Sequence, residues 1–204
     1  MIEPMFIRKF LPDEICNFVY NYCILKFSQE EEIEDRIDFQ THSFISRYGD
    51  PVMETILDMT TPVIEQNVGK KLWPANSFFR IYDKTSDLPI HTDRGSCEYT
   101  IALCLGAQPS DKPYNIYLGE LDPNSDYGYF YDDKKWEKVK IEHKFPMLPN
   151  DALIFQGVNK VHWREYCEHD HYITVFLHYV EQEGEYKHLK FDKRRSLGAP
   201  KAHD

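Results

Sequence analysis

From Ser77 to Val180 the chain contains six short runs rich in β-branched and aromatic residues. They read SFFRIYD, YTIALCLG, YNIYLGEL, KWEKVKIEH, ALIFQG and YITVFLHYV. Between them stand stretches such as DKTSD, GAQPSDKP and MLPND, whose residues favour turns. No helical pattern separates successive runs, so the crossovers that a parallel sheet needs are missing. The pattern therefore predicts antiparallel strands folded as a sandwich or jelly roll.

The residues before Leu72 follow a helical pattern instead. LPDEICNFVYNYCILKF places apolar residues at helical spacing, namely Ile15, Phe18, Val19, Tyr22 and Leu25. A second helix is predicted with Asp50 as its N-cap and Pro51 in its first turn, and Pro62 threatens a break or kink. Its predicted buried stripe is Val52, Ile56, Leu57, Met59 and Ile64. We thus expect one α+β domain with a helical buttress at 1–71, a β core at 72–182 and a polar tail at 183–204.

Composition narrows the range of partners and compartments. A formal net charge of −10 disfavours binding to nucleic acid or to an anionic membrane. No apolar run approaches the ~20 residues of a membrane span. The 5 cysteines form no C-x-x-C pair, which is typical of a reduced protein without disulfides. MIEPMFIRKF lacks the apolar stretch of a signal peptide, so we expect a cytoplasmic protein.

Two good metal ligands, His91 and Asp93, stand one residue apart in IHTDRGSCEYTIALCLG. On a strand they would point to the same face. Composition alone predicts about 9 × 34/204 ≈ 1.5 His-x-Asp/Glu matches, so the pair needs support from a third ligand. His162 follows a turn, a buried strand and a loop, and a double-stranded β-helix could bring it beside His91. Two histidines and one carboxylate form the facial triad of non-haem Fe(II) oxygenases.

At these residues the sequence resembles a known family. FFRIYDKTSDLPIHTDRGSCEYTIALCLG, NDALIFQGVNKVHWRE and ITVFLHYV are similar to the 2-oxoglutarate- and Fe(II)-dependent dioxygenases, nearest the prolyl 4-hydroxylase-like branch and an uncharacterised microbial and viral subgroup of it. The resemblance implies a double-stranded β-helix, a jelly-roll or cupin-like fold. It also implies that His91, Asp93 and His162 bind Fe(II), that 2-oxoglutarate is the cosubstrate, and that dioxygen binds at the remaining site.

One position departs from the family pattern. Many relatives carry an Arg or Lys that pairs with the far carboxylate of 2-oxoglutarate, and Asp170 falls near that place here. The resemblance then implies other anchors. Arg164 can share the face of His162, and a guanidinium can hold a carboxylate with two hydrogen bonds. Tyr82 stands where relatives offer a phenol, and His171 is a reserve candidate.

The resemblance implies hydroxylation of an unactivated C–H bond, with release of succinate and CO2. Arg94 and Arg80 are candidates for substrate binding, and a surface ion pair to the acidic helical region is the alternative for Arg94. The substrate could be an amino acid, a peptidyl residue or a small metabolite. Two other functions stay open: an iron oxidase that uses no 2-oxoglutarate, and a non-catalytic metal-binding jelly-roll module.

Overall fold

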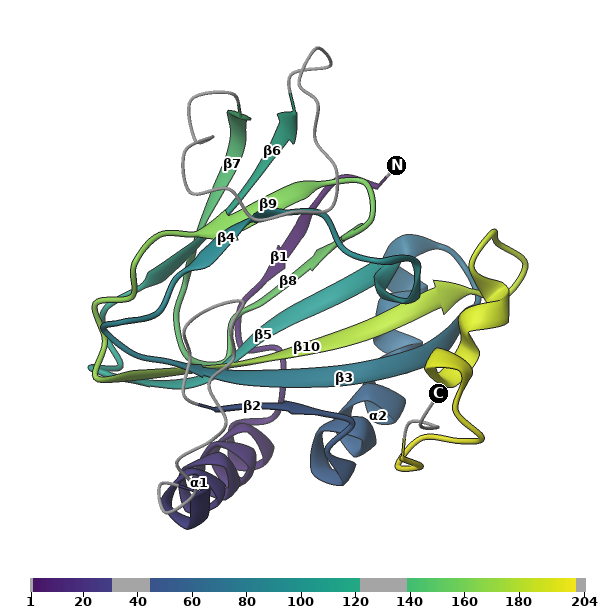
Figure 1. Cartoon of the computed structure of the whole chain (residues 1–204). Helices are drawn as coiled ribbons and strands as arrows, with labels where there is room; N and C mark the ends of the chain where they lie inside the picture. Colours follow the sequence, from purple (N-terminus) through teal and green to yellow (C-terminus); the bar gives the residue numbers. More distant parts are fainter. Residues whose placement is uncertain (1, 31–44, 122–138, 201–204) are drawn as a thin grey trace.

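The computed structural model describes residues 2–30, 45–121 and 139–200 of the chain. Its larger sheet is antiparallel, with six strands (Figure 1). In spatial order they are β1 (Met5–Ile7), β8 (Ala152–Phe155), β5 (Tyr99–Gln108), β10 (His171–Glu181), β3 (Leu72–Tyr82) and β2 (Ile45–Tyr48). The smaller sheet has four strands and faces the first. They are β4 (Leu88–His91), β9 (Val161–Arg164), β6 (Tyr114–Leu121) and β7 (Val139–Met147).

Two antiparallel sheets confirm the predicted fold class, and all six predicted strands are present. The beginning of the KWEKVKIEH run, at 135–138, lies outside the described residues. The pattern missed β1, β2, β4 and β9, each of which has only three or four residues. Runs this short contain too few alternations for period-two hydrophobicity to be recognised. His162 therefore lies within a strand, β9, and not on the loop that the sequence suggested.

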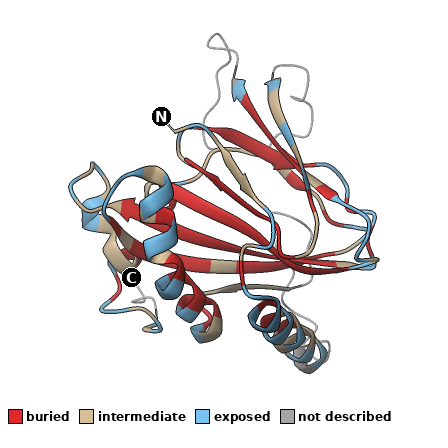
Figure 2. Ribbon diagram, turned by 180° about the vertical axis from the view of Figure 1, so that it is seen from behind, coloured by how far each residue is buried: buried red, intermediate tan, exposed pale blue. Residues whose placement is uncertain are grey.

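Alternation along β10 divides the interior into two cores. Ile173, Val175, Leu177 and Tyr179 pack against the helices on the outer face of the larger sheet. The intervening side chains of Tyr172 and Phe176 point between the two sheets. The central strands β8, β5 and β10 are accordingly buried on both faces along almost their whole length, as Figure 2 shows. The space between the two sheets is where the functional site lies.

Helices α1 (Asp13–Glu30) and α2 (Pro51–Val68) cover the outer face of the larger sheet. The predicted N-cap is confirmed: the Asp50 carboxylate accepts hydrogen bonds from the backbone N–H groups of Val52 and Met53. Helix α2 continues past Pro62 to Val68, where Gly69 caps the last turn in the left-handed conformation. Burial of Ile64 against the sheet stabilises the turn that follows the proline. The expected break does not occur.

The buried faces of both helices differ from the prediction. In α1 the exposed residues include Ile15, Phe18 and Leu25, whereas Cys16, Val19 and Cys23 are buried. The apolar residues of α1 surround the helix, so their spacing could not identify the face that packs on the sheet. In α2 Met59 is exposed, while the other predicted residues are buried or half-buried.

After β10 the chain forms a short 3-10 segment, η3 (Lys187–Lys193), beside one end of the larger sheet (Figure 1). Its Lys190 ammonium lies 3.5 Å from the centre of the Trp73 ring on β3. Further along, the Arg194 guanidinium forms a buried ion pair with Glu54 on α2. These contacts agree with the expectation that the polar tail packs outside the sheets. Within the described residues, no helix is long and apolar enough to cross a membrane.

Candidate active site

The structure brings His91, Asp93 and His162 together between the two sheets. Their ligand atoms all lie within 4.8 Å of one another. Asp93 Oδ1 is 3.6 Å from Nε2 of His91 and 3.6 Å from Nε2 of His162. The two histidines are neighbours because β4 and β9 pair with His91 opposite His162. Residues 71 positions apart thus meet across one rung of a short sheet.

Backbone carbonyls orient both imidazoles. His91 Nδ1 is 2.8 Å from the carbonyl oxygen of Pro89, and His162 Nδ1 is 3.0 Å from that of Lys160. A carbonyl oxygen only accepts, so the proton of each ring must be on Nδ1. Each Nε2 then presents a lone pair, and both face Asp93 Oδ1. This is the arrangement that metal-binding histidines use.

Asp93 reaches the histidines by a different route from the one expected. It lies two residues beyond the end of β4, so strand alternation does not place it. Its backbone N–H donates to the carbonyl oxygen of Gly157, 2.9 Å away in the turn between β8 and β9. A Cβ atom at Gly157 would lie 2.0 Å from Asp93 Oδ2, so only glycine leaves room for this carboxylate. The turn before β9 therefore holds the third ligand.

The electrostatics of the cluster suit metal binding at neutral pH. Burial, with the neighbouring His162, lowers the pKa of His91 to about 3, so this imidazole is neutral. Burial acts to raise the pKa of Asp93, but the facing imidazoles of His162, His178 and His91 hold it below its ordinary value. The cluster is thus one carboxylate with two imidazole nitrogens, a set that fits a divalent first-row metal.

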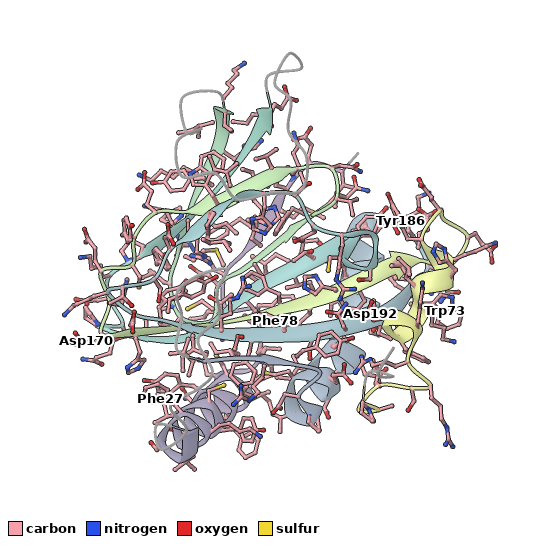
Figure 3. All side chains as sticks on the ribbon, viewed as in Figure 1. Phe27, Trp73, Phe78, Asp170, Tyr186 and Asp192 are labelled. Carbon is pink, nitrogen blue, oxygen red and sulfur yellow. The ribbon has the colours of Figure 1, made fainter. Side chains whose placement is uncertain are left out.

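A cavity of about 290 Å³ opens beside the three ligands. Its far wall is formed by β3 and β10 of the larger sheet, from which Phe78 and Phe176 supply apolar surface. Asn76, Arg80 and His178 add polar groups to the same wall. Tyr48 and Arg94 lie at the end nearest the C-terminal segment, where Figure 3 labels Asp192.

Arg164 lies two residues beyond His162 on β9 and is fully buried. Its guanidinium carbon is 4.7 to 5.9 Å from the ring centres of Tyr82, Tyr114 and Tyr172. Nη1 donates to the carbonyl oxygen of Tyr114 at 2.9 Å, whereas Nε and Nη2 have no hydrogen-bond partner among the described residues. No carboxylate of the described chain pairs with it. Arg164 and Tyr82, both predicted, are thus neighbours in an aromatic compartment next to the metal ligands.

Two other positions discussed from the sequence, His171 and Asp170, lie away from that compartment. His171 is on the opposite face of β10, where Nε2 is 2.8 Å from the Tyr20 hydroxyl on α1, so it cannot serve as the reserve anchor. Asp170 projects from the end of the sheet and pairs with Lys84 at 2.6 Å (Figure 3). It is exposed, so the departure from the family pattern places no acid in the interior.

Arg94 lines the cavity, and its guanidinium forms an ion pair with Asp192. Its two terminal nitrogens donate to the two carboxylate oxygens of Asp192 at 2.7 and 2.8 Å. The Tyr48 hydroxyl donates to the same carboxylate at 2.6 Å. Arg94 therefore forms an ion pair with the C-terminal segment, whereas most of the acidic region named as the alternative lies outside the described residues. Arg80, the other predicted substrate residue, also lines the cavity.

Sequence reasoning missed some of the polar lining. Asn76 and His178 both line the cavity, and the sequence patterns identified neither of them as part of the site. Thr100 donates towards Asp93 Oδ2 at 3.3 Å and contacts His178 Nδ1 at 3.1 Å. A signal was present, because Asn76 and Arg80 share the period-two face of β3 with Phe78. Which face of β3 turned inwards could not be read from the sequence.

No protein-family model and no curated protein sequence matches the chain. Similar solved structures exist, however. A Pseudomonas putida prolyl-4-hydroxylase has a TM-score of 0.57 at 14% identity and covers 86% of this chain and 91% of its own. AviO1 from Streptomyces viridochromogenes has a TM-score of 0.63 at 13% identity, covering 89% and 90%. HygX from Streptomyces hygroscopicus, solved with nickel and 2-oxoglutarate, has a TM-score of 0.56 at 10% identity, covering 88% and 83%.

The chain has the double-stranded β-helix fold of these enzymes. The resemblance read from the sequence is therefore confirmed at the level of the fold. At identities of 10 to 14% the similarity shows the fold alone, and the chemistry depends on the residues of this chain's own site.

Proposed function

We propose that the protein is a 2-oxoglutarate- and Fe(II)-dependent oxygenase that hydroxylates a C–H bond of a small substrate. The observation that carries the proposal is the pairing of two features inside one β-helix. The first is a His-x-Asp…His cluster whose nitrogen lone pairs face one carboxylate oxygen. The second is a buried guanidinium with unpartnered donors two residues further along the same strand.

The donor set fits iron. His91 and His162 would bind the metal through Nε2, and Asp93 would bind it through Oδ1, as a facial triad. The neutral imidazole of His91 and the ionised carboxylate of Asp93 need lose no proton before metal binding. When bound, iron with 2-oxoglutarate and dioxygen supplies the oxidising power, and 2-oxoglutarate leaves as succinate and CO2.

Arg164 would hold the far carboxylate of 2-oxoglutarate. A buried cation without a carboxylate is costly, and its unpartnered Nε and Nη2 can donate to an anion. The tyrosines around it stabilise the charge through their ring faces and exclude water. Tyr82, among these rings, would offer its hydroxyl to the same carboxylate. His162 and Arg164 share one face of β9, so metal and anchor would hold the two ends of one small acid.

The test is an anaerobic titration of the apo-protein with Fe(II) and then with 2-oxoglutarate, followed by visible absorbance. A weak charge-transfer band on the second addition would report chelation of the metal by the keto acid. Succinate release in air would then report turnover. Iron binding without the band would contradict the proposal in favour of an oxidase that uses no 2-oxoglutarate. Absence of iron binding would instead favour a non-catalytic jelly roll.

A further inference from the structure

Three polar side chains of the larger sheet line the cavity beside the metal ligands. Asn76 and Arg80 come from β3 and His178 comes from β10. β3 directs Asn76, Phe78 and Arg80 to one face at period two, and the β10–β3 register places His178 opposite Asn76. The three are therefore parts of one wall and do not belong to the aromatic compartment around Arg164.

Asn76 indicates that this wall binds something. Its side chain is 2% exposed, and its amide nitrogen has no hydrogen-bond partner among the described residues. A buried amide donor without a partner is costly, and native structures retain few of them. Because Asn76 lines the cavity, a ligand there could accept its hydrogen bond.

His178 is set up as an acceptor by its neighbours. Thr100 Oγ1 lies 3.1 Å from His178 Nδ1, 3.3 Å from Asp93 Oδ2 and 3.4 Å from the Cys97 carbonyl oxygen. The Asp93 carboxylate is the strongest acceptor of the three, so we assign the single hydroxyl proton of Thr100 to it. His178 Nδ1–H then donates to Thr100, which leaves Nε2 as a lone-pair acceptor.

Arg80 gives this wall a positive charge close to the metal ligands. The side chain lies over Phe78, 4.7 Å from the ring centre, and is 5% exposed. Its charge contributes to lowering the pKa of His91. Arg94, the other arginine of the cavity, is held by both oxygens of Asp192. We assign anion binding to Arg80 because it lines the cavity on the same face of β3 as Asn76.

We propose that Asn76, Arg80 and His178 form the substrate subsite, and that the substrate is a small α-amino acid. Arg80 and Asn76 would bind its carboxylate, and His178 Nε2 would accept a hydrogen bond from its amino group. This inference rests on the proposed function, because it concerns the substrate of the same site. The cavity of about 290 Å³ lies at the lower end of ligand-pocket sizes, which suits such a molecule.

The test compares free L-amino acids with their α-carboxamides, which keep the side chain and amino group but lose the carboxylate. Binding is measured as a shift in melting temperature of the full chain loaded with Ni(II) and 2-oxoglutarate. Turnover is measured separately as succinate release with Fe(II). We expect at least one free acid to raise the melting temperature and to increase succinate release at least tenfold. Its amide should do neither.

Variants then assign the effect to the wall. Arg80→Met and Asn76→Leu should lose the response to the active acid while keeping the KM for 2-oxoglutarate within twofold. Arg8→Met, at the exposed residue that follows β1, removes one positive charge outside the cavity and should keep the response. A large rise in the KM for 2-oxoglutarate in Arg80→Met would overturn the inference, because Arg80 would then hold the cosubstrate.

Two further outcomes also overturn it. The first is that the α-carboxamides act as well as the free acids. The second is that none of the free L-amino acids changes the melting temperature or succinate release, in which case peptides would be tested next. Failure of the proposed function is a separate result. Without a charge-transfer band or succinate in the wild-type protein, 2-oxoglutarate is not the cosubstrate. The melting shift of the Ni(II)-loaded chain would still decide whether this wall binds amino acids.

Discussion

Arg164 is the residue on which the choice of cosubstrate depends. It is a buried guanidinium with unpartnered donors, surrounded by three tyrosine rings. Replacing an unpaired buried cation by an apolar side chain of similar length is often neutral or stabilising. If Arg164 serves stability, its replacement should lower the stability of the protein. If it serves to bind an anion, its replacement should weaken anion binding and leave stability unchanged or higher.

We expect Arg164→Met to raise the KM for 2-oxoglutarate by roughly 10- to 100-fold, the value of one or two charge-assisted hydrogen bonds. Without 2-oxoglutarate, its melting temperature should equal or exceed that of the wild type. Steady-state succinate release and thermal melting measure the two effects, with Arg8→Met as the charge-matched control. Lower stability with an unchanged KM would identify Arg164 as a structural residue.

The lowered pKa of the buried His178 makes the stability of the folded protein depend on pH. Burial lowers its pKa from 6.5 to about 4, so the folded protein takes up this proton only near pH 4, whereas the unfolded chain takes it up near pH 6.5. The unfolded state therefore binds more protons between these values, and stability falls as the pH is lowered through that window. Across this window the titration of His178 lowers the free energy of unfolding by about 3 kcal/mol, and below pH 4 it causes no further loss.

Urea unfolding of the metal-free protein at several values between pH 7 and pH 4 measures this effect. His178→Gln keeps a side chain that can hydrogen-bond Thr100 but cannot titrate. We expect the free energy of unfolding of the variant to fall less steeply with decreasing pH than that of the wild type. Parallel curves for the two proteins would contradict the assignment.

At the scale of elements, the turn between β8 and β9 decides where Asp93 lies. Gly157 accepts the Asp93 N–H, and its missing Cβ makes room for Asp93 Oδ2. A Cβ there would also lie 2.9 Å from the Cys97 carbonyl oxygen, so backbone and ligand would both have to move. The site thus depends on a residue that carries no functional group.

We expect Gly157→Ala to weaken Fe(II) binding by roughly 10- to 100-fold, as displacement of groups that support metal ligands does. Titration with Fe(II) under anaerobic conditions measures it. Gly69→Ala is the matched control: this glycine caps α2 at φ +69° and has nothing within 4 Å of a Cβ. The control should lose stability but keep its metal affinity. Equal iron affinity in Gly157→Ala and wild type would contradict this account of the turn.

At the scale of the whole molecule, the C-terminal segment is bound to α2 and to the mouth of the cavity. Arg194 pairs with Glu54 although 140 residues separate them, and both side chains are at most 2% exposed. The same segment carries Asp192, which holds Arg94 and Tyr48. Residues from three distant parts of the sequence therefore shape one end of the cavity.

We expect Arg194→Met to destabilise the protein by about 3–5 kcal/mol, because it leaves the Glu54 carboxylate buried and unpaired. Adding Glu54→Gln should recover part of this loss, since the remaining group is neutral. Urea denaturation of the wild type, both single variants and the double variant forms the thermodynamic cycle. Strictly additive losses would show that the two side chains do not interact.

Sequence patterns predicted the strand-rich class and the N-cap of α2, and the resemblance added His162 to the His91–Asp93 pair as a candidate metal ligand. The first two predictions are local, because alternation and capping chemistry are properties of neighbouring residues. His91 and Asp93 were correctly paired, although a turn brings them together and not the strand alternation first assumed. The resemblance supplied the order in which these short motifs occur.

Which side chains meet in the interior depends on how the two sheets pair and pack. The tertiary structure turned His171 towards Tyr20 and Asp170 to the surface, and it placed Arg164 among three tyrosines. It also joined Arg94 to Asp192, 98 residues away, which no local pattern could predict. The physical reason is that alternation along a strand indicates which residues share a face. Strand pairing and sheet packing determine which distant residues that face contacts.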